Sequence, residues 1–232
     1  MRIAVLQPSY MPWLGYLDQI ARCDAFVFYD DVQYDKNGWR NRNRIRVASE
    51  AGWAWLTVPI HLEGSLPSLL EVAADPRVPW RRKHLAKIQG AYARAKHYEL
   101  LGEFFAEFFA GDEPRLVEIA IQSVQAFMKA FNITTPLNRS SALDIGGTRN
   151  ERLINICRHF GATHYLSGDA ARSYLDVALF EQNGIEVEWQ SYDHPTYAQL
   201  HEPFVSHLSS LDALLCAGLG AKRFLGLEPS IS

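Results

Sequence analysis

The chain has 232 residues, of which 48% are hydrophobic and 21% are charged. This composition excludes a disordered chain and a low-complexity linker, because enough apolar residues are present to build a core. Lys and Arg number 23 against 26 Asp and Glu, which gives a net charge of −3. No overall positive field therefore exists to bind a long nucleic acid.

Three cysteines, Cys23, Cys157 and Cys216, lie far apart in apolar patterns. This spacing predicts reduced thiols, because a disulfide framework or a thiolate zinc site needs paired, closely spaced cysteines. No signal peptide is recognisable, and no apolar run approaches the roughly 20 residues that span a bilayer. We therefore expect a cytoplasmic protein without a transmembrane segment. The sequence leaves its oligomeric state open.

The first thirty residues predict a strand, a helix and a second strand. Apolar runs at 3–6 and 25–29 are typical of parallel strands that are covered on both faces. Between them, Leu17, Ile20 and Ala21 form a short apolar helix face. Such a β-α-β opening predicts a parallel sheet.

The next hundred residues predict a hairpin and then helices. Residues 42–47 and 53–58 alternate on either side of a turn at 49–52, which indicates a β-hairpin, and a further short strand is expected at 69–73. Three apolar helical patterns follow between 80 and 132.

The α/β pattern then resumes to the end of the chain. Strands are predicted at 136–142, 164–166 and 185–189, with helices between them. Thr148 and Glu151 have the spacing of a capping box, and Ser209 or Ser210 is expected to cap the last helix. We predict a single α/β domain over 1–232, with a Rossmann-like, mainly parallel sheet and flanking helices. A β-hairpin excursion over 39–75 and a helical insertion over 79–132 interrupt it.

The loops that follow the predicted strands are rich in hydroxyls, amides and aromatic rings. Ligands of a parallel sheet bind beyond the carboxyl ends of its strands, so these loops should meet at one edge. In the first loop two prolines restrict the backbone, and Gly15 opens a helix whose N-terminus can receive an anion. A rigid connection whose rings cover the core is the other interpretation.

Charged residues between 30 and 46 form a second candidate site. Asp30 and Asp31 are candidates to hold Mg²⁺ against a diphosphate, or one of them to act as a general base. Lys36, Arg40, Arg42 and Arg44 supply cations for a phosphate or carboxylate. The other interpretation is a solvated turn followed by an edge strand whose arginines face water. We expect that second situation for Arg44 and Arg46.

A third candidate lies at the start of the first long helix. Trp80, Lys83, His84 and Lys87 share one helix face, where they could close over an acidic ligand or simply form a basic surface. The eight histidines show no metal-binding spacing, so we predict no metal site of the zinc type. A Walker loop, a Gly-x-Gly-x-x-Gly loop and a nucleophile elbow are missing from the sequence.

Several of these segments resemble the signature of the WbqC-like family. They are Gln7-Pro-Ser-Tyr-Met-Pro-Trp-Leu-Gly-Tyr16, Asp30-Asp31-Val32-Gln33-Tyr34, Trp39-Arg40-Asn41-Arg42-Asn43-Arg44-Ile45, Tyr165-Leu166-Ser167-Gly168, Tyr174-Leu175 and Ser209-Ser210-Leu211-Asp212. The resemblance runs across essentially the whole chain. It implies a context of bacterial O-antigen and other surface-polysaccharide genes, and a glycine or aminoacyl transferase role. It brings no established catalytic residues with it.

A more distant resemblance is to the nucleotidyltransferase superfamily. Trp13-Leu14-Gly15-Tyr16 stands where that superfamily has a His-x-Gly-His loop, after a first strand and at the start of a helix. Both histidines are replaced here, by Trp13 and Tyr16. Those histidines stabilise charge on the transferring phosphate, so ordinary nucleotidyl transfer is in doubt even if the scaffold is shared.

The leading hypothesis is an enzyme of surface-polysaccharide (O-antigen) biosynthesis that transfers an aminoacyl (glycyl) or other acyl group to an amino sugar or nucleotide-linked sugar. One alternative is a nucleotide-binding, nucleotidyltransferase-like enzyme with an altered loop. Another is a non-catalytic binding or scaffold protein of the assembly complex. The expected ligand is a phosphorylated or sugar-containing small molecule, with a nucleotide or nucleotide-sugar and Mg²⁺ as the candidate cofactor.

The predicted site combines three catalytic candidates with a larger set of binding residues. The catalytic candidates are Asp30, Lys36 and Tyr16. The predicted substrate-binding residues are Gln7, Tyr10, Trp13, Gly15, Trp39, Asn41, Arg42, Lys83, His84, Ser140, Ser141, Ser167, Gly168 and Tyr174.

Overall fold

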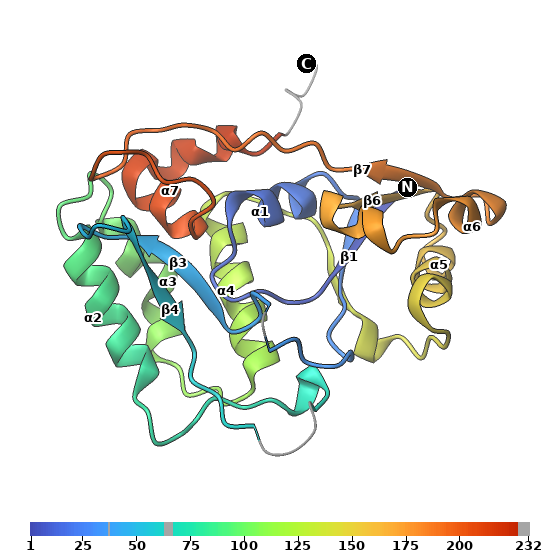
Figure 1. Cartoon of the computed structure of the whole chain (residues 1–232), viewed down its shortest axis with the longest axis horizontal. Coiled ribbons are helices and arrows are strands. Elements are labelled where there is room, and N and C mark those ends of the chain that lie inside the picture. The colour runs from blue at the N-terminus through green and yellow to red at the C-terminus, as the bar shows by residue number, and fades with distance from the viewer. Residues whose placement is uncertain (37, 63–66, 227–232) are drawn as a thin grey trace.

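A five-stranded parallel sheet forms the centre of the computed structural model, which describes residues 1–36, 38–62 and 67–226 (Figure 1). The strands are β1 (Arg2–Leu6), β2 (Ala25–Phe28), β5 (Leu137–Arg139), β6 (His164–Ser167) and β7 (Glu186–Trp189). Their order is β5-β2-β1-β6-β7. After β1, the chain adds β2 and β5 on one side of that strand, and it then crosses over to add β6 and β7 on the other side. The predicted Rossmann-like α/β fold is confirmed.

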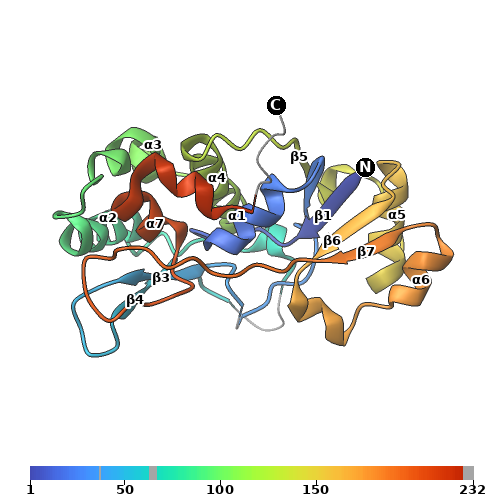
Figure 2. The same cartoon turned by 90° about the horizontal axis from the view of Figure 1, so that it is seen from above.

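Strand β1 is covered on both faces, which explains its continuous apolar run. Ala4 belongs to a core shared with α1 (Leu14–Ala21) and α4 (Leu116–Ala130). Ile3 and Val5 point the other way, into a core shared with α5 (Arg149–His159) and α6 (Val177–Gln182). Figure 2 shows these helix pairs on opposite sides of the sheet. Successive strand residues point to opposite faces, so both sets must be apolar.

The predicted hairpin and helical insertion lie together at the end of the molecule away from α5 and α6 (Figure 1). The hairpin consists of β3 (Arg42–Arg46) and β4 (Trp53–Thr57), which pair antiparallel. The insertion consists of α2 (Trp80–Tyr92), α3 (Glu99–Ala110) and α4. Within the described residues, no helix is long and apolar enough to cross a membrane.

The strand expected at 69–73 is wrong. The chain forms a 3-10 helix, η1 (Leu69–Glu71), because Ser68 and Glu71 make a capping box. The Ser68 amide donates to the Glu71 carboxylate at 2.9 Å, and Leu70 N donates to Ser68 Oγ at 3.4 Å. Residues 140–142 likewise form a 3-10 helix, η2 (Ser140–Ala142), so β5 is shorter than predicted.

Both helix starts that were predicted from capping residues are confirmed. The Thr148 amide donates to the Glu151 carboxylate at 3.4 Å at the start of α5. Ser209 Oγ accepts a hydrogen bond from Leu211 N at 3.3 Å at the start of α7 (Ser210–Ala217). These caps place the first residues of α5 and the segment that precedes α7, and both contribute to the site described below.

Arg46 does not face water as expected. Its exposed fraction is 2%, and its guanidinium donates to the backbone carbonyls of His201 and Pro203, each at 2.9 Å, and to that of Gly52. These bonds fasten the segment before α7 to the hairpin. Arg46 is buried because a segment more than 150 residues away in the sequence covers this position of β3.

We predict that Arg46→Met destabilises the protein by about 3 kcal/mol, because several buried carbonyls lose a charged donor at once. The free energy of unfolding in urea measures this loss. Arg94→Met is the matched control, since Arg94 is exposed in the turn after α2, and its effect should stay within about 0.5 kcal/mol. Equal effects of the two substitutions would show that Arg46 does not hold the segment.

Candidate functional site

A large pocket opens at the carboxyl ends of β1 and β6, where the strand order changes direction. We call it the switch-point pocket, and its volume is about 720 Å³. It is lined by Val5, Leu6, Gln7, Tyr29, Asp35, Arg40, Arg149, Asn150, Leu153, Tyr165 and Tyr174. Loops after β1, β2, β5 and β6 therefore meet at one edge of the sheet, where ligands of open α/β folds bind.

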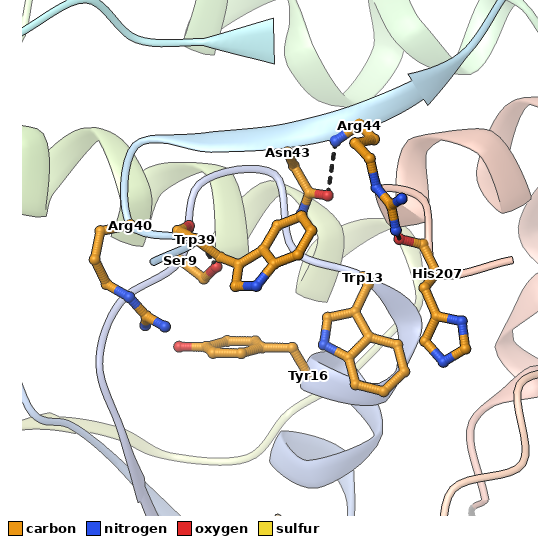
Figure 3. A pocket seen from close by; sticks show the side chains of 8 residues that line it. All are labelled: Ser9, Trp13, Tyr16, Trp39, Arg40, Asn43, Arg44 and His207. Carbon is orange, nitrogen blue, oxygen red and sulfur yellow. Dashed lines mark hydrogen bonds between the residues drawn. The ribbon is translucent and has the colours of Figure 1, made fainter. Parts of the chain in front are cut away.

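A second pocket, of about 280 Å³, lies on the side of the hairpin (Figure 3). We call it the ring pocket. It is lined by Ser9, Trp13, Tyr16, Trp39, Arg40, Asn43, Arg44 and His207. Hydrogen bonds between distant segments build it: Ser9 Oγ donates to the Trp39 carbonyl at 2.9 Å, and Ser209 N donates to the Arg44 carbonyl at 2.9 Å. The first loop, the hairpin and the segment before α7 are thereby held around one space.

Arg40 lines both pockets. Its Nη1 donates to the carbonyls of Gln7 and Pro8, at 2.9 Å and 3.3 Å. Its Nε is buried and has no hydrogen-bond partner among the described residues. Burial lowers the pKa of the guanidinium, but an arginine still keeps its charge at neutral pH. The negative charge of Asp35, which lines the switch-point pocket with Arg40, acts against this effect and favours the charged guanidinium. A positive charge therefore lies between the two pockets.

Trp13 and Tyr16 are positioned by the start of α1. The Tyr16 hydroxyl donates to the Gln7 carbonyl at 3.1 Å, and burial raises the pKa of Tyr16 well above its usual value, so it stays neutral. A Cβ added at Gly15 would lie 2.2 Å from the Trp13 ring. Glycine at this position therefore lets the Trp13 indole lie against the helix and form a wall of the ring pocket.

The Asp30 carboxylate is buried and already fully hydrogen bonded. It accepts from Arg139 Nε at 2.6 Å and from the amide and hydroxyl of Ser141 at 2.9 Å and 2.8 Å, and Ser140 Oγ lies 3.1 Å from its Oδ1. The sequence interpretation correctly grouped Asp30 with Ser140 and Ser141, but neither serine lines the switch-point pocket or the ring pocket. This cluster joins the ends of β2 and β5.

Asp31 is also engaged, by Arg152 and by Ser140 Oγ at 2.6 Å. Burial acts to raise the pKa of Asp31, but these hydrogen bonds outweigh it and lower the pKa. Mg²⁺ needs oxygen ligands that are free to point at it. The oxygens of Asp30 and Asp31 point at arginines and serines instead, so this pair does not fit a Mg²⁺ ion, and we derive no step through one.

The two residues of α2 that were predicted to bind substrate, Lys83 and His84, lie in different environments. His84 is buried, where its Nδ1 contacts the Tyr10 hydroxyl at 2.8 Å and its Nε2 contacts the Thr57 carbonyl at 3.1 Å. Burial lowers the pKa of His84 to about 4, so the ring is neutral. Lys83 is exposed. Tyr10, Lys83 and His84 line neither pocket.

The remaining predicted residues are spread over the site and its surroundings. Asn41 is buried and donates to the Val58 carbonyl at 2.9 Å, and Arg42 lies 4.8 Å from the Trp55 ring centre. Both therefore support the hairpin. Lys36 is exposed in the loop after β2, Ser167 is buried at the end of β6, and Gly168 caps η3 (Asp169–Ser173). Gln7 and Tyr174 line the switch-point pocket, and Trp39 lines the ring pocket.

Several lining residues of the two pockets were missed, and three of them, Arg149, Asn150 and His207, matter most for the site. Arg149 and Asn150 begin α5 and line the switch-point pocket, and their place directly after the Thr148 cap was an available signal. His207 lines the ring pocket from a segment without regular structure. No local pattern marks it, because hydrogen bonds to the hairpin and the first loop put it there.

These features define a Rossmann-like α/β protein with a candidate small-molecule site. The chain belongs to the WbqC-like protein family, whose model matches residues 7–224. It is 33% identical over 226 residues to the uncharacterized protein Rv1507c of Mycobacterium tuberculosis, and the match covers 97% of each chain. No solved structure matches it.

We predict that Gly15→Ala destabilises the protein by about 1 to 3 kcal/mol, because the added methyl group displaces the Trp13 ring. Urea unfolding provides the measurement. Gly90→Ala in α2 is the control: no atom lies within 4 Å of its added Cβ, and alanine there should stabilise the helix by about 0.5 to 1 kcal/mol. A neutral or stabilising Gly15→Ala would contradict the assigned packing of Trp13.

Proposed function

We propose that the protein is a transferase of bacterial surface-polysaccharide (O-antigen) biosynthesis that moves an aminoacyl (glycyl) or other acyl group to the sugar of a nucleotide-linked substrate. The observation that carries the proposal is the position of Arg40. Its charged group belongs to both pockets, so it can hold the phosphates of a molecule whose two ends occupy different spaces. Membership of the WbqC-like family supports the biosynthetic context.

The switch-point pocket has the size and lining for the nucleotide end. A volume of about 720 Å³ lies within the range of sites for drug-sized ligands and cofactors. The rings of Tyr29, Tyr165 and Tyr174 line it, and aromatic faces pack well on a base or ribose. Arg149 adds a second cation to the lining of this pocket, which suits a diphosphate.

The ring pocket suits the sugar end. Trp13, Tyr16 and Trp39 surround about 280 Å³, enough for a single sugar with the acyl group arriving from outside. The apolar faces of a sugar ring pack on indole and phenol rings, while convergent polar groups fix its orientation. Asn43 and Arg44 supply such groups at the wall formed by the hairpin.

In the proposed site, the three catalytic candidates have roles other than the catalytic ones first considered. Asp30 holds the ends of β2 and β5, since its oxygens already accept three hydrogen bonds. Tyr16 shapes the ring pocket and orients the Gln7 carbonyl. Lys36 is exposed in the loop after β2, where it can attract an anionic ligand.

We expect the protein to bind uridine diphosphate glucose or uridine diphosphate N-acetylglucosamine, and Arg40→Gln to weaken that binding by about 10- to 100-fold, because a charge-assisted contact with phosphate is lost. Isothermal titration calorimetry measures the dissociation constant. Arg82→Gln, an exposed position on α2, is the control and should bind like the wild type. Equal binding by both variants would remove Arg40 from the site.

Catalysis is tested separately from binding. Purified protein with these nucleotide-sugars, their amino-sugar counterparts and activated acyl donors should yield an acylated sugar in a mass-spectrometric screen. Tight nucleotide-sugar binding without any product across the donor set would instead favour the non-catalytic binding or scaffold function.

One observation raises a second candidate function, nucleotidyl transfer. Trp13 is the N-cap of α1 and Tyr16 lies in its first turn, and both line the ring pocket, as the histidines of a nucleotidyltransferase loop would be placed. We expect ATP–pyrophosphate exchange to stay at background with Mg²⁺, because neither replacement side chain carries a positive charge for the transferring phosphate. Exchange above background that Tyr16→Phe or Trp13→Phe abolishes would make nucleotidyl transfer the function.

A further inference from the structure

Two histidines lie against one another at one end of the ring pocket. The ring centres of His207 and His194 are 4.8 Å apart, and His207 lies 5.1 Å from the ring of Trp13. Figure 3 shows His207 beside Trp13. His207 follows no secondary-structure pattern, yet its position is well determined by the hydrogen bonds that tie Ser209 to Arg44 and Ser210 to Pro12, at 2.9 Å and 2.8 Å.

The backbone of His207 is held in an uncommon conformation. Its φ angle is +56°, in the left-handed region that residues other than glycine rarely adopt. Its carbonyl accepts a hydrogen bond from Arg44 Nη2 at 3.3 Å. Such conformations cost free energy and gather at functional sites, where the surrounding structure maintains them. The strain therefore points to a role for the side chain that it places.

The contacts of the two imidazole rings leave a ring nitrogen whose lone pair can accept a proton. His194 Nδ1 contacts the Pro195 carbonyl at 3.0 Å, and a carbonyl only accepts, so this nitrogen carries the hydrogen and Nε2 keeps a lone pair. His207 Nδ1 contacts Ser206 Oγ at 2.8 Å, which permits the same tautomer. No described residue hydrogen bonds to His207 Nε2.

No other described side chain of the ring pocket suits proton abstraction. The guanidinium groups of Arg40 and Arg44 have no lone pair to offer. Ser9 and Tyr16 already donate to backbone carbonyls, and burial raises the pKa of Tyr16. The Trp13 and Trp39 rings and the Asn43 amide are not bases near neutral pH. His207 alone of the eight described lining residues meets the requirement.

The surroundings of His207 favour its neutral form, although the residue is exposed. Burial first, and then the positive charge of Arg44, lower its pKa. Burial and the neighbouring His207 ring lower the pKa of His194 in the same way. A histidine whose pKa is lowered is deprotonated through the neutral range and becomes protonated only at more acidic pH, so it can accept a proton under ordinary conditions.

We propose that His207 is the proton acceptor of the acyl transfer, with His194 as the residue that positions it. This inference rests on the function proposed above. The acceptor nitrogen or oxygen of the sugar forms a bond to the acyl carbon and gives its proton to His207 Nε2. The bond between the acyl carbon and the leaving group breaks, and the leaving group keeps the electron pair. The imidazolium then returns the proton to the leaving group, which restores the neutral ring.

The first test needs no substrate. Diethyl pyrocarbonate acylates neutral imidazole, so its rate at each histidine, followed by peptide mass spectrometry between pH 5 and 8, reports each titration. We expect the midpoint of His207 to lie below about 6.5, the usual histidine value. Arg44→Gln should raise it, because a positive charge beside the ring is removed, whereas His159→Gln, at an exposed position on α5, should not. A midpoint at or above the usual value, unmoved by Arg44→Gln, overturns the proposal.

The second test separates this proposal from the proposed function. His207→Gln should bind uridine diphosphate N-acetylglucosamine within about threefold of the wild type, while kcat for acyl transfer falls by about 100-fold or more and the acidic limb of its pH profile is lost. An unchanged kcat with that limb intact overturns His207 as the proton acceptor and leaves the transferase standing. A wild-type protein that binds but transfers nothing overturns the transferase, and His207 with it.

Discussion

The site depends on the pairing of β1 with a parallel partner on each side. Ile3 is in register with Ala25 of β2 and with Tyr165 of β6, so the three strands point their carboxyl ends at the same edge. Because the chain adds β2 and β5 on one side and β6 and β7 on the other, the loops after β1 and β6 separate. The switch-point pocket occupies that gap, and Gln7 at the end of β1 presents its carbonyl to Arg40.

Charged groups near this edge have two different roles. Arg139 on β5 donates to Asp30 and to Glu118 of α4, each at 2.6 Å, so the Asp30 cluster ties the sheet to the helical insertion. A carboxylate bound in this way stabilises the architecture, because its lone pairs are already used. Arg40 differs, since its side chain donates to the neutral carbonyls of Gln7 and Pro8, and its Nε has no hydrogen-bond partner among the described residues. The same residue type therefore supports the fold at one position and offers a binding group at another.

The large number of aromatic residues in the chain divides between packing and the site. Phe105 and Phe127 pack α3 on α4 with ring centres 4.8 Å apart. On the hairpin, the Arg44 guanidinium lies 5.5 Å from the Trp39 ring centre and 5.1 Å from that of Trp53. These cation–π contacts hold Arg44 and Trp39 in place where they line the ring pocket. A rigid aromatic wall preserves the shape of a site before any ligand arrives.

Local signals in the sequence were enough to determine the fold class and most of its elements. Apolar runs predicted the parallel strands, alternation predicted the hairpin, and capping residues placed the starts of α5 and α7, because each of these patterns acts within a few residues. The same short range explains the wrong strand at 69–73, where the capping box of Ser68 and Glu71 favoured a helical turn. The loop after β1 was recognised as part of the site for the same reason, since it directly follows a strand.

The tertiary structure alone decided which polar residues face a ligand. Asp30 and Arg46 looked like a candidate base and a solvated arginine, and both became buried when segments about 110 and 155 residues away packed against them. His207 gained its place through backbone hydrogen bonds from its neighbours to the hairpin and the first loop. Arg40 came to lie between two pockets for the same physical reason. Burial and hydrogen bonding of a side chain depend on partners distant in sequence, and no local pattern encodes which partners those are.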